Sequence, residues 1–471
     1  IAHARKRIAE LQAKHGDDVV FYLHRSAKCD FFKKAGIYMD AVMLLAEGWT
    51  RPRQYTDPKW EAWAEGTRNP NEPVWDVIAG NVGALGILGT AEDIAAGKDV
   101  KVDPKLRFKA ALVSDADNVW PKGQIRKMVA KIVHPSNSNI TIFQPSIELL
   151  NPDENGFLKL TSWARQMYGF DPVAKWRLYH FTPFFGKGAM NVENYVKEII
   201  KSEWLHPGGS ASHDFQEALK AWSVLVEDVS IMEKGFSNKL AEMIRGASWQ
   251  WGDMETVRRL FAKRFEPGRA AHLGVLLGNL IGSPVYALWV VLTCLTWMAP
   301  AFAQVQCPRR LFLLFASCVI AWVGVPHFAV PLISRYKERT CTAAAPQISE
   351  LNVVRIVMIG AAATAALVLI HMLDLVYKTM ALVRNAAGQS AGKAFVWKTG
   401  AICEIETANV SLLGAYKALY VSTAIGAAFL LCWTFGIFPA AVNIFLLPYT
   451  ASFLLGPLVI WITAKPREIK V

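Results

Sequence analysis

The chain has 471 residues, of which 53% are hydrophobic and 19% are charged, and its formal net charge is +12. Charged residues become sparse after residue 275, so the composition indicates a membrane protein. The basic excess lies largely beside apolar segments and lacks an aromatic recognition pattern, which argues against nucleic acid as a partner. Seven cysteines without a CxxC pair argue against a zinc site or a disulfide framework.

Residues 1–265 are predicted to form an α/β domain, because short β-branched or aromatic runs alternate with helical stretches. The clearest runs are residues 19–23, 109–117 and 140–147. The chain opens with a charged helical stretch and has no initial methionine or signal peptide, so we expect it to be a fragment. Residues 41–108 are rich in Trp, Pro and charge and are either a solvated loop or a regulatory or partner-binding element.

An Asp-x-Asp motif ends one of the predicted strands. Asp115 and Asp117 alternate with Ala116, so in extended chain both carboxylates point to one side. A turn there would place them around one Mg2+ or Mn2+ ion, which would neutralise a diphosphate leaving group. Ligands of an open α/β sheet gather at this end of the strands. The alternative is an ordinary solvated turn.

A second carboxylate motif, SHDFQE, occupies residues 212–217 and begins a stretch predicted to be helical, FQEALKAWSVLVED. An inverting sugar transfer needs one carboxylate to take a proton from the acceptor hydroxyl, and Asp214 is placed to do so. His213 and Glu217 are competing candidates, and a helix N-cap is the structural alternative for Asp214.

Two tryptophans follow in RGASWQWGD, residues 245–253. The indoles of Trp249 and Trp251 can form a platform for the apolar face of a sugar, and Arg245 can bind a phosphate bidentately. Both tryptophans could equally belong to a core or anchor the membrane interface.

Residues 266–471 are predicted to form a transmembrane or channel domain. Five apolar stretches are long enough to span a membrane: residues 275–302, 311–333, 353–375, 418–436 and 439–463. Basic segments at 333–339 and 465–470 are predicted to be cytoplasmic. A cytoplasmic domain before the first span and a cytoplasmic tail after the last require an even number of spans, which conflicts with five. We therefore expect one stretch to be re-entrant or interfacial, or one of the side assignments to be wrong. Residues 377–417 are predicted to form an interfacial helix and a loop, and on these grounds alone AFVWKTGA at 394–401 would be an ordinary connector.

Taken as a set, these motifs resemble family-2-like processive membrane glycosyltransferases of cellulose-synthase-like architecture. The likeness is greatest to the transferase domains of cyclic β-1,2-glucan synthases and of osmoregulated periplasmic glucan glucosyltransferases. It rests on KKAGIYMD (33–40), DADNVWPKGQIRKMVAKIVHP (115–135), IFQPSI (142–147), FFGKGAMNVENY (184–195), SHDFQE and WQWGD (249–253).

This resemblance implies a glycosyltransferase-A-type (Rossmann-like) cytoplasmic α/β domain followed by an α-helical transmembrane domain. It implies that Asp115 and Asp117 hold the metal and that Asp214 is the base. The resemblance further implies that the donor is bound by Asp115, Lys34 and Arg245. The residues implied to bind the acceptor are Trp249, Trp251, Gly186, Lys187 and Gly188. The residues implied to form a gating loop are Phe395, Lys398, Thr399 and Gly400.

The chain departs from the family in three respects. Residues 41–108 form an unusually long insertion between KKAG and the Asp-x-Asp motif. Ser248 precedes Trp249 where the related motif has Arg, so diphosphate contact there would fall to Arg245 or another residue. The family's first strand, whose acidic residue contacts the uracil, should lie upstream of KKAG and is not found before Ile1.

The expected function is a processive inverting β-glucan synthase of the plasma (inner) membrane. It would transfer glucose from UDP-glucose to a glycan acceptor, with membrane lipid as a further partner and oligomers possible. Cellulose-like, β-1,3-glucan, chitin, hyaluronan and glycolipid synthesis are alternatives within the class. A non-catalytic transporter or a scaffold is the alternative outside it.

Overall fold

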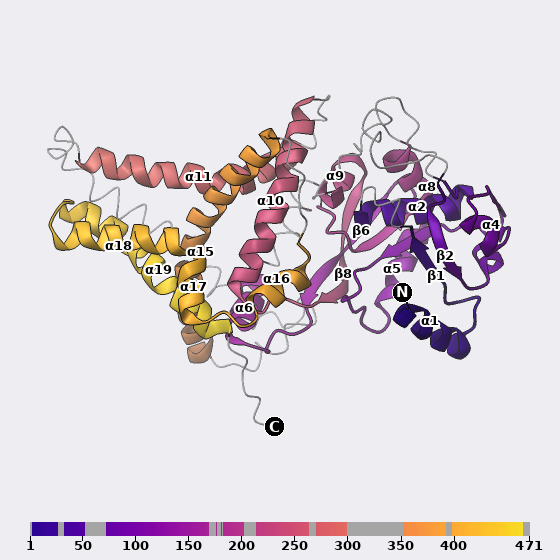
Figure 1. Ribbon diagram of the computed structural model, residues 1–471, viewed down its shortest axis with the longest axis horizontal. Helices are drawn as coiled ribbons and strands as arrows, with labels where there is room; N and C mark the ends of the chain where they lie inside the picture. The colour runs from indigo at the N-terminus through magenta and orange to yellow at the C-terminus, as the bar shows by residue number, and fades with distance from the viewer. Residues whose placement is uncertain are drawn as a thin grey trace, which may run out of the picture. The chain divides into compact units, whose positions relative to one another are not determined.

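The computed structural model describes residues 2–26, 33–51, 72–168, 176, 180, 182–201, 213–262, 270–298, 353–391 and 398–464. The chain divides into two compact units, Ile1–Ser146 with Lys175–Ile231, and Ile147–Ala174 with Met232–Val471. The first is a mixed α/β unit and the second is mainly helical (Figure 1). This division differs from the predicted boundary at residue 265, because the tryptophan-bearing helix belongs to the helical unit.

A four-stranded mixed sheet, in the order β5-β7-β6-β8, organises the α/β unit. Its strands are β5 (Ala110–Val113), β7 (Gly188–Asn191), β6 (Ile142–Leu149) and β8 (Ser223–Glu233). β7 is antiparallel to both β5 and β6. Backbone bonds from Ile142 N to Trp222 O and from Leu150 N to Glu233 O advance in the same direction, so β6 and β8 are parallel. The unit boundaries fall within β6 and β8.

The helix α5 (Gln124–Val133) covers one face of this sheet. Met128 and Ile132, one helical turn apart, are buried with Phe143, Ala189 and three valines of β8, Val224, Val226 and Val229. The other helical elements of this unit are α1 (Ala2–His15), α2 (Lys33–Glu47), η4 (Pro135–Asn137), α8 (Val192–Tyr195), the π-helical turn η5 (Val196–Ile200) and α9 (His213–Lys220).

The prediction that FQEALKAWSVLVED is one helix is wrong. The helix α9 ends at Lys220, and β8 begins at Ser223. The run from Ser223 is rich in β-branched residues and pairs with β6. Strand pairing therefore overrides the helix that the spacing of FQEALK had suggested for these residues.

The described residues 72–102 of the long insertion fold around a core and do not form a solvated loop. Its elements are β2 (Trp75–Ala79), η3 (Val82–Leu85), β3 (Ile87–Leu88), α4 (Ala91–Ala95) and β4 (Lys101–Val102). β2 pairs with β1 (Tyr22–Arg25), and Trp75, Ile87 and Ile94 are almost completely buried together. A buried ion pair of 2.8 Å between Arg25 and Asp40 further fixes β1 to α2.

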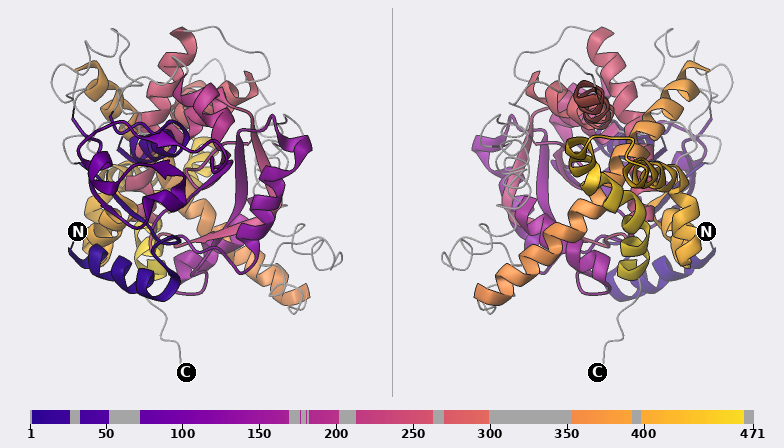
Figure 2. Two further views of the ribbon diagram at one scale, coloured as in Figure 1. Left: turned by 90° about the vertical axis from the view of Figure 1, so that its right-hand side faces the viewer. Right: turned by 90° about the vertical axis from the view of Figure 1, so that its left-hand side faces the viewer.

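The helical unit contains α6 (Gly156–Tyr168), α10 (Lys239–Ala262), α11 (Ala270–Met298), α15 (Val353–Ser390), α16 (Gly400–Thr407), α17 (Leu412–Ala418), α18 (Tyr420–Thr434) and α19 (Ala440–Ala464). The helix α15 is continuous over 38 residues and runs diagonally through the right view of Figure 2. It extends beyond the predicted span end at 375, so residues 377–390 continue this helix and are not a separate interfacial one.

Two described helices are long and apolar enough to cross a membrane, Val357–Ser390 and Val442–Ala464. A third crossing is added if α17 and α18, which meet at 87°, form one broken span. Within α11 the described apolar part is Leu280–Thr296, which is shorter than these spans. The predicted stretch at 311–333 lies outside the described residues. A membrane protein is therefore supported with two or three spans in the part of the chain that the structure describes.

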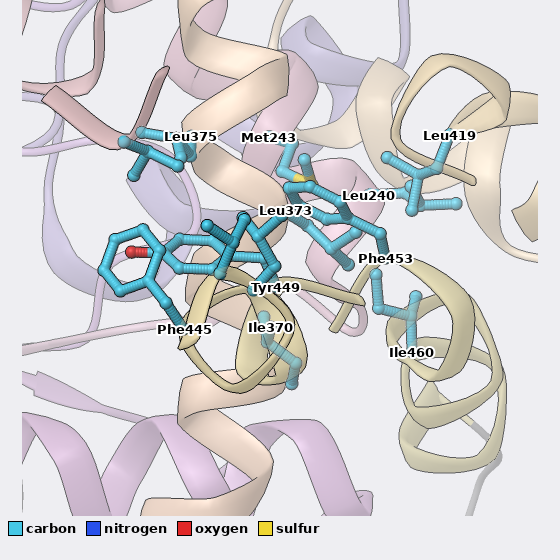
Figure 3. Close-up of a cluster of buried hydrophobic side chains, with 13 residues drawn as sticks. Leu240, Met243, Ile370, Leu373, Leu375, Leu419, Phe445, Tyr449, Phe453 and Ile460 are labelled. Atoms are coloured by element: carbon cyan, nitrogen blue, oxygen red, sulfur yellow. The ribbon is translucent and has the colours of Figure 1, made fainter. Parts of the chain in front are cut away.

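Apolar side chains of α10, α11, α15, α18 and α19 form one core (Figure 3). Leu240 and Met243 of α10 pack with Ile370 and Leu373 of α15 and with an aromatic row on α19. The row consists of Phe445, Tyr449 and Phe453, spaced four residues apart, so they share one helix face.

Candidate functional site

The Asp-x-Asp motif forms a tight turn directly after β5. The backbone N–H of Asp115 donates to Asn118 Oδ1 at 2.9 Å, and the N–H of Asn118 donates to the Asp115 carbonyl at 3.1 Å. The turn leaves Asp115 half-buried and Asp117 exposed. Both carboxylates therefore remain at the carboxyl end of a sheet strand, where a ligand can reach them.

Lys187 connects this turn to the Gly-Lys-Gly segment. Val113 pairs with Gly188 in the β5–β7 ladder, which sets Lys187 beside the end of β5. Its Nζ lies 3.5 Å from Asp115 Oδ2, and its side chain is only 12% exposed. The Asp-x-Asp turn and the Gly-Lys-Gly segment, which are far apart in the sequence, therefore lie side by side.

Gly186 connects the same loop to Asp214. Its φ is +69°, a left-handed conformation that favours glycine, and a Cβ added there would lie 2.5 Å from Asp214 Oδ2. Asp214 is half-buried in the first turn of α9. The absence of a side chain at Gly186 therefore makes room for the carboxylate predicted to be the base.

Gln144 of the IFQPSI strand holds this loop in place. It is fully buried, its Nε2 donates to the Pro145 carbonyl at 2.8 Å, and its Oε1 accepts from the Phe185 N–H at 2.9 Å. Gly188 passes so close to this strand that a Cβ would lie 2.6 Å from the Phe143 carbonyl. The sequence analysis included this motif but predicted no role for Gln144. A glutamine within an otherwise apolar strand could have indicated a buried side chain that hydrogen-bonds to a neighbouring loop.

Tyr38 was not identified from the sequence. Its hydroxyl donates to Glu217 Oε1 at 2.9 Å, and both side chains are buried. Burial, and then the negative charge of Glu217, raise the pKa of Tyr38 well above its usual value, and Tyr195 and Asp214 add to the effect. Lys34, predicted to bind the donor, lies one helical turn before Tyr38 in the first turn of α2. Since Glu217 is buried and engaged with Tyr38, Asp214 is the better placed of these two carboxylates to meet a substrate.

In the helical unit, Trp249 lies on α10 within a cluster of polar and aromatic groups. Its side chain is 44% exposed, the Arg245 guanidinium carbon lies 5.5 Å from its ring centroid, and Phe236 meets it edge-on. Arg245 Nη1 also donates to the Lys398 carbonyl at 2.7 Å. The described end of the predicted gating loop is therefore attached to the helix that carries the tryptophan motif.

Three residues of the predicted gating loop, Lys398, Thr399 and Gly400, make local structural contacts. Lys398 Nζ pairs with Glu406 at 2.8 Å, and the Thr399 hydroxyl caps α16 by accepting from the Ile402 N–H. Gly400 begins α16 and faces Phe236. Phe395 lies outside the described residues.

Trp251 has different surroundings from Trp249. It is 8% exposed, its Nε1 donates to Glu255 Oε1 at 2.9 Å, and its ring packs against Gly388 of α15. The Gln389 amide also donates to the Trp251 carbonyl at 3.0 Å. An acceptor platform is consequently easier to build from Trp249 than from Trp251, although sequence reasoning treated the two alike.

A divalent cation is compatible with the donor groups present. Among the described residues no group of three or more His, Cys, Asp or Glu side chains forms a complete metal site. Mg2+ is, however, commonly held by one or two carboxylates together with substrate phosphates. Asp115 and Asp117 offer such an incomplete set of hard oxygen donors, and Lys187 beside them suits an anionic substrate.

Comparison of the chain with protein-family models and with curated protein sequences gives no match.

Proposed function

We propose that this protein is an inverting glycosyltransferase of the membrane that uses a nucleoside diphosphate sugar. The observation that carries the proposal is the convergence at Lys187 and Gly186: one contacts Asp115 of the Asp-x-Asp turn and the other adjoins Asp214. A site that must hold a diphosphate and deprotonate a hydroxyl needs these two kinds of carboxylate in one pocket.

In the proposed reaction the acceptor hydroxyl oxygen attacks the anomeric carbon of the donor sugar. The bond from that carbon to the diphosphate oxygen breaks, and its electron pair leaves with the nucleoside diphosphate. Asp214 takes the proton of the attacking hydroxyl. A divalent cation held by Asp115 and Asp117 would supply charge neutralisation to the diphosphate. Lys187, which the resemblance assigned to the acceptor, is reassigned in this proposal to the donor, because its ammonium group lies beside Asp115.

Trp249 is the proposed platform for the acceptor. Its exposed indole offers an apolar face that suits the C–H face of a sugar ring, and Arg245 stacks beside it. The C-terminal helices would then carry the product across the membrane, with the α/β unit on the cytoplasmic side. UDP-glucose and a β-glucan product remain our proposed donor and polymer.

Membranes that contain the full-length protein, incubated with labelled UDP-glucose, UDP-N-acetylglucosamine or UDP-glucuronate and Mg2+ or Mn2+, test the proposal. We expect polymer from one donor, and Asp214→Asn to abolish it. Asp228→Asn is the matched control, because Asp228 belongs to the same unit and its ion pair with Lys131 is exposed to solvent. Absence of both polymer and donor hydrolysis in wild type would overturn the proposal in favour of a transporter or scaffold.

A further inference from the structure

Glu217 is a carboxylate whose burial requires a partner. Its side chain has no exposed surface, and the hydroxyl of Tyr38, itself only 8% exposed, donates to it at 2.9 Å. A carboxylate removed from water is costly unless hydrogen bonds replace its hydration. The hydroxyl of Tyr38 thus favours the ionised form of Glu217.

Glu217 also shares a helix face with Asp214. The two residues are three positions apart on α9, a spacing that brings side chains to within about 5–6 Å at their Cβ atoms. Both carboxylates act on the same phenol, because each contributes to the raised pKa of Tyr38. The charge of Glu217 is therefore close enough to affect whether Asp214 is protonated.

Two other described groups adjoin Asp214. One is Tyr38 of α2, whose pKa Asp214 helps to raise, and the other is Gly186, whose added Cβ would meet the carboxylate. Tyr195 of α8 lies beside Tyr38, with the two ring centroids 6.3 Å apart. Lys187, the nearest described cation along that loop, pairs with Asp115. Glu217 is thus the anionic neighbour of Asp214 on its own helix.

We propose that Tyr38 and Glu217 are positioning residues that set the pH at which Asp214 accepts its proton, an inference that rests on the proposed glycosyltransferase function. Tyr38 keeps Glu217 ionised, and the negative charge of Glu217 disfavours a second charge on Asp214. Asp214 thereby becomes a stronger base than an isolated aspartate, as proton transfer near neutral pH requires.

The test is the pH dependence of kcat for polymer synthesis by wild type, Glu217→Gln and Tyr38→Phe. Both variants remove the charge of Glu217, the first directly and the second by withdrawing the hydrogen bond that keeps it ionised. We expect the acidic limb of the profile to move to lower pH by about one unit in both variants. Glu193→Gln and Tyr22→Phe, which make the same chemical changes outside the cluster, should leave the limb in place.

The outcomes separate this inference from the proposed function. An active wild type whose acidic limb is the same in both variants, even if kcat falls, would leave Tyr38 and Glu217 with a purely structural role. A wild type without transferase activity would overturn the proposed function and this inference with it. Because the two substitutions preserve side-chain volume and act on different helices, loss of fold in one variant still leaves the other as a test.

Discussion

Lys187 Nζ lies 3.5 Å from Asp115 Oδ2, and this ion pair joins the Asp-x-Asp turn to the loop that approaches Asp214. The pair lies at the carboxyl end of β5, where Lys187 is largely shielded and Asp115 remains 35% exposed. The pair places a positive charge directly beside the Asp-x-Asp turn. The ion pair is thus the most direct link between the metal motif and the proposed base.

Replacing Lys187 should weaken donor binding. Charge-assisted hydrogen bonds contribute about 1.5–3 kcal/mol, so Lys187→Met should raise the KM for the sugar nucleotide about tenfold or more. Lys187→Arg should retain part of the affinity because it keeps the charge. Lys201→Met is the matched control, since the Lys201–Glu47 pair of 3.0 Å is more exposed. An unchanged KM in Lys187→Met would remove Lys187 from the donor site.

A methyl group at Gly186 should abolish transfer. Gly186→Ala would force a non-glycine residue into a left-handed conformation and push its Cβ against the Asp214 carboxylate. Gly123→Ala separates the two effects, because Gly123 has a φ of +86° but no atom within 4 Å of an added Cβ. Both variants should lose about 1–2 kcal/mol of unfolding free energy. Only Gly186→Ala should lose polymer synthesis, and comparable activity in the two variants would contradict this account.

Much of the α/β unit could be anticipated from local sequence. Strands within the runs 109–117 and 140–147 were predictable because their β-branched and apolar residues end at turn or proline signals. The structure confirms a strand in each run, β5 at Ala110–Val113 and β6 at Ile142–Leu149. The strand β8 was missed because FQEALK gives a helical spacing that appears to continue into SVLVED. Pairing with β6, which local sequence does not encode, determines where that helix ends.

The motifs of the candidate site could be predicted from the sequence, but the contacts that hold its residues in place could not. Acidic and glycine-rich segments are visible as residue types, whereas the Tyr38–Glu217 bond joins positions far apart in the sequence. The different burial of Trp249 and Trp251 was equally inaccessible, because it depends on α15 continuing as far as Gly388. Long-range packing decides both features.

The two tryptophans should respond differently to substitution. Trp249→Ala should reduce polymer elongation while donor hydrolysis continues, because an exposed acceptor platform is lost without disturbing the fold. Trp251→Ala should lower the unfolding free energy by about 3–5 kcal/mol, as removal of a large buried aromatic side chain does. Thermal unfolding in detergent and product length analysis check the two effects. If Trp249→Ala destabilised the protein as much as Trp251→Ala, Trp249 would be better explained as a core residue.

A buried ion pair links α10 to α15 and should make stability depend on pH. Lys239 Nζ lies 3.0 Å from Asp374 Oδ2 and 3.1 Å from Glu242, and both Lys239 and Asp374 are less than 10% exposed. Burial alone would lower the pKa of Lys239, but Glu242 and Asp374 together raise it above its ordinary value. The stabilising contribution of Lys239 should therefore be complete below about pH 10.4 and be lost as pH rises through the raised pKa.

Asp374→Asn should lower the unfolding free energy by about 3–5 kcal/mol, because it leaves a buried ammonium without its buried partner. The double variant Lys239→Met, Asp374→Leu should recover most of that loss, since Glu242 is 39% exposed and can be hydrated. Thermal unfolding in detergent from pH 7 to pH 11 provides the measurement. Wild type should lose its advantage over the double variant at the alkaline end. An advantage that grows with pH would show that the ammonium of Lys239 is not stabilised by these carboxylates.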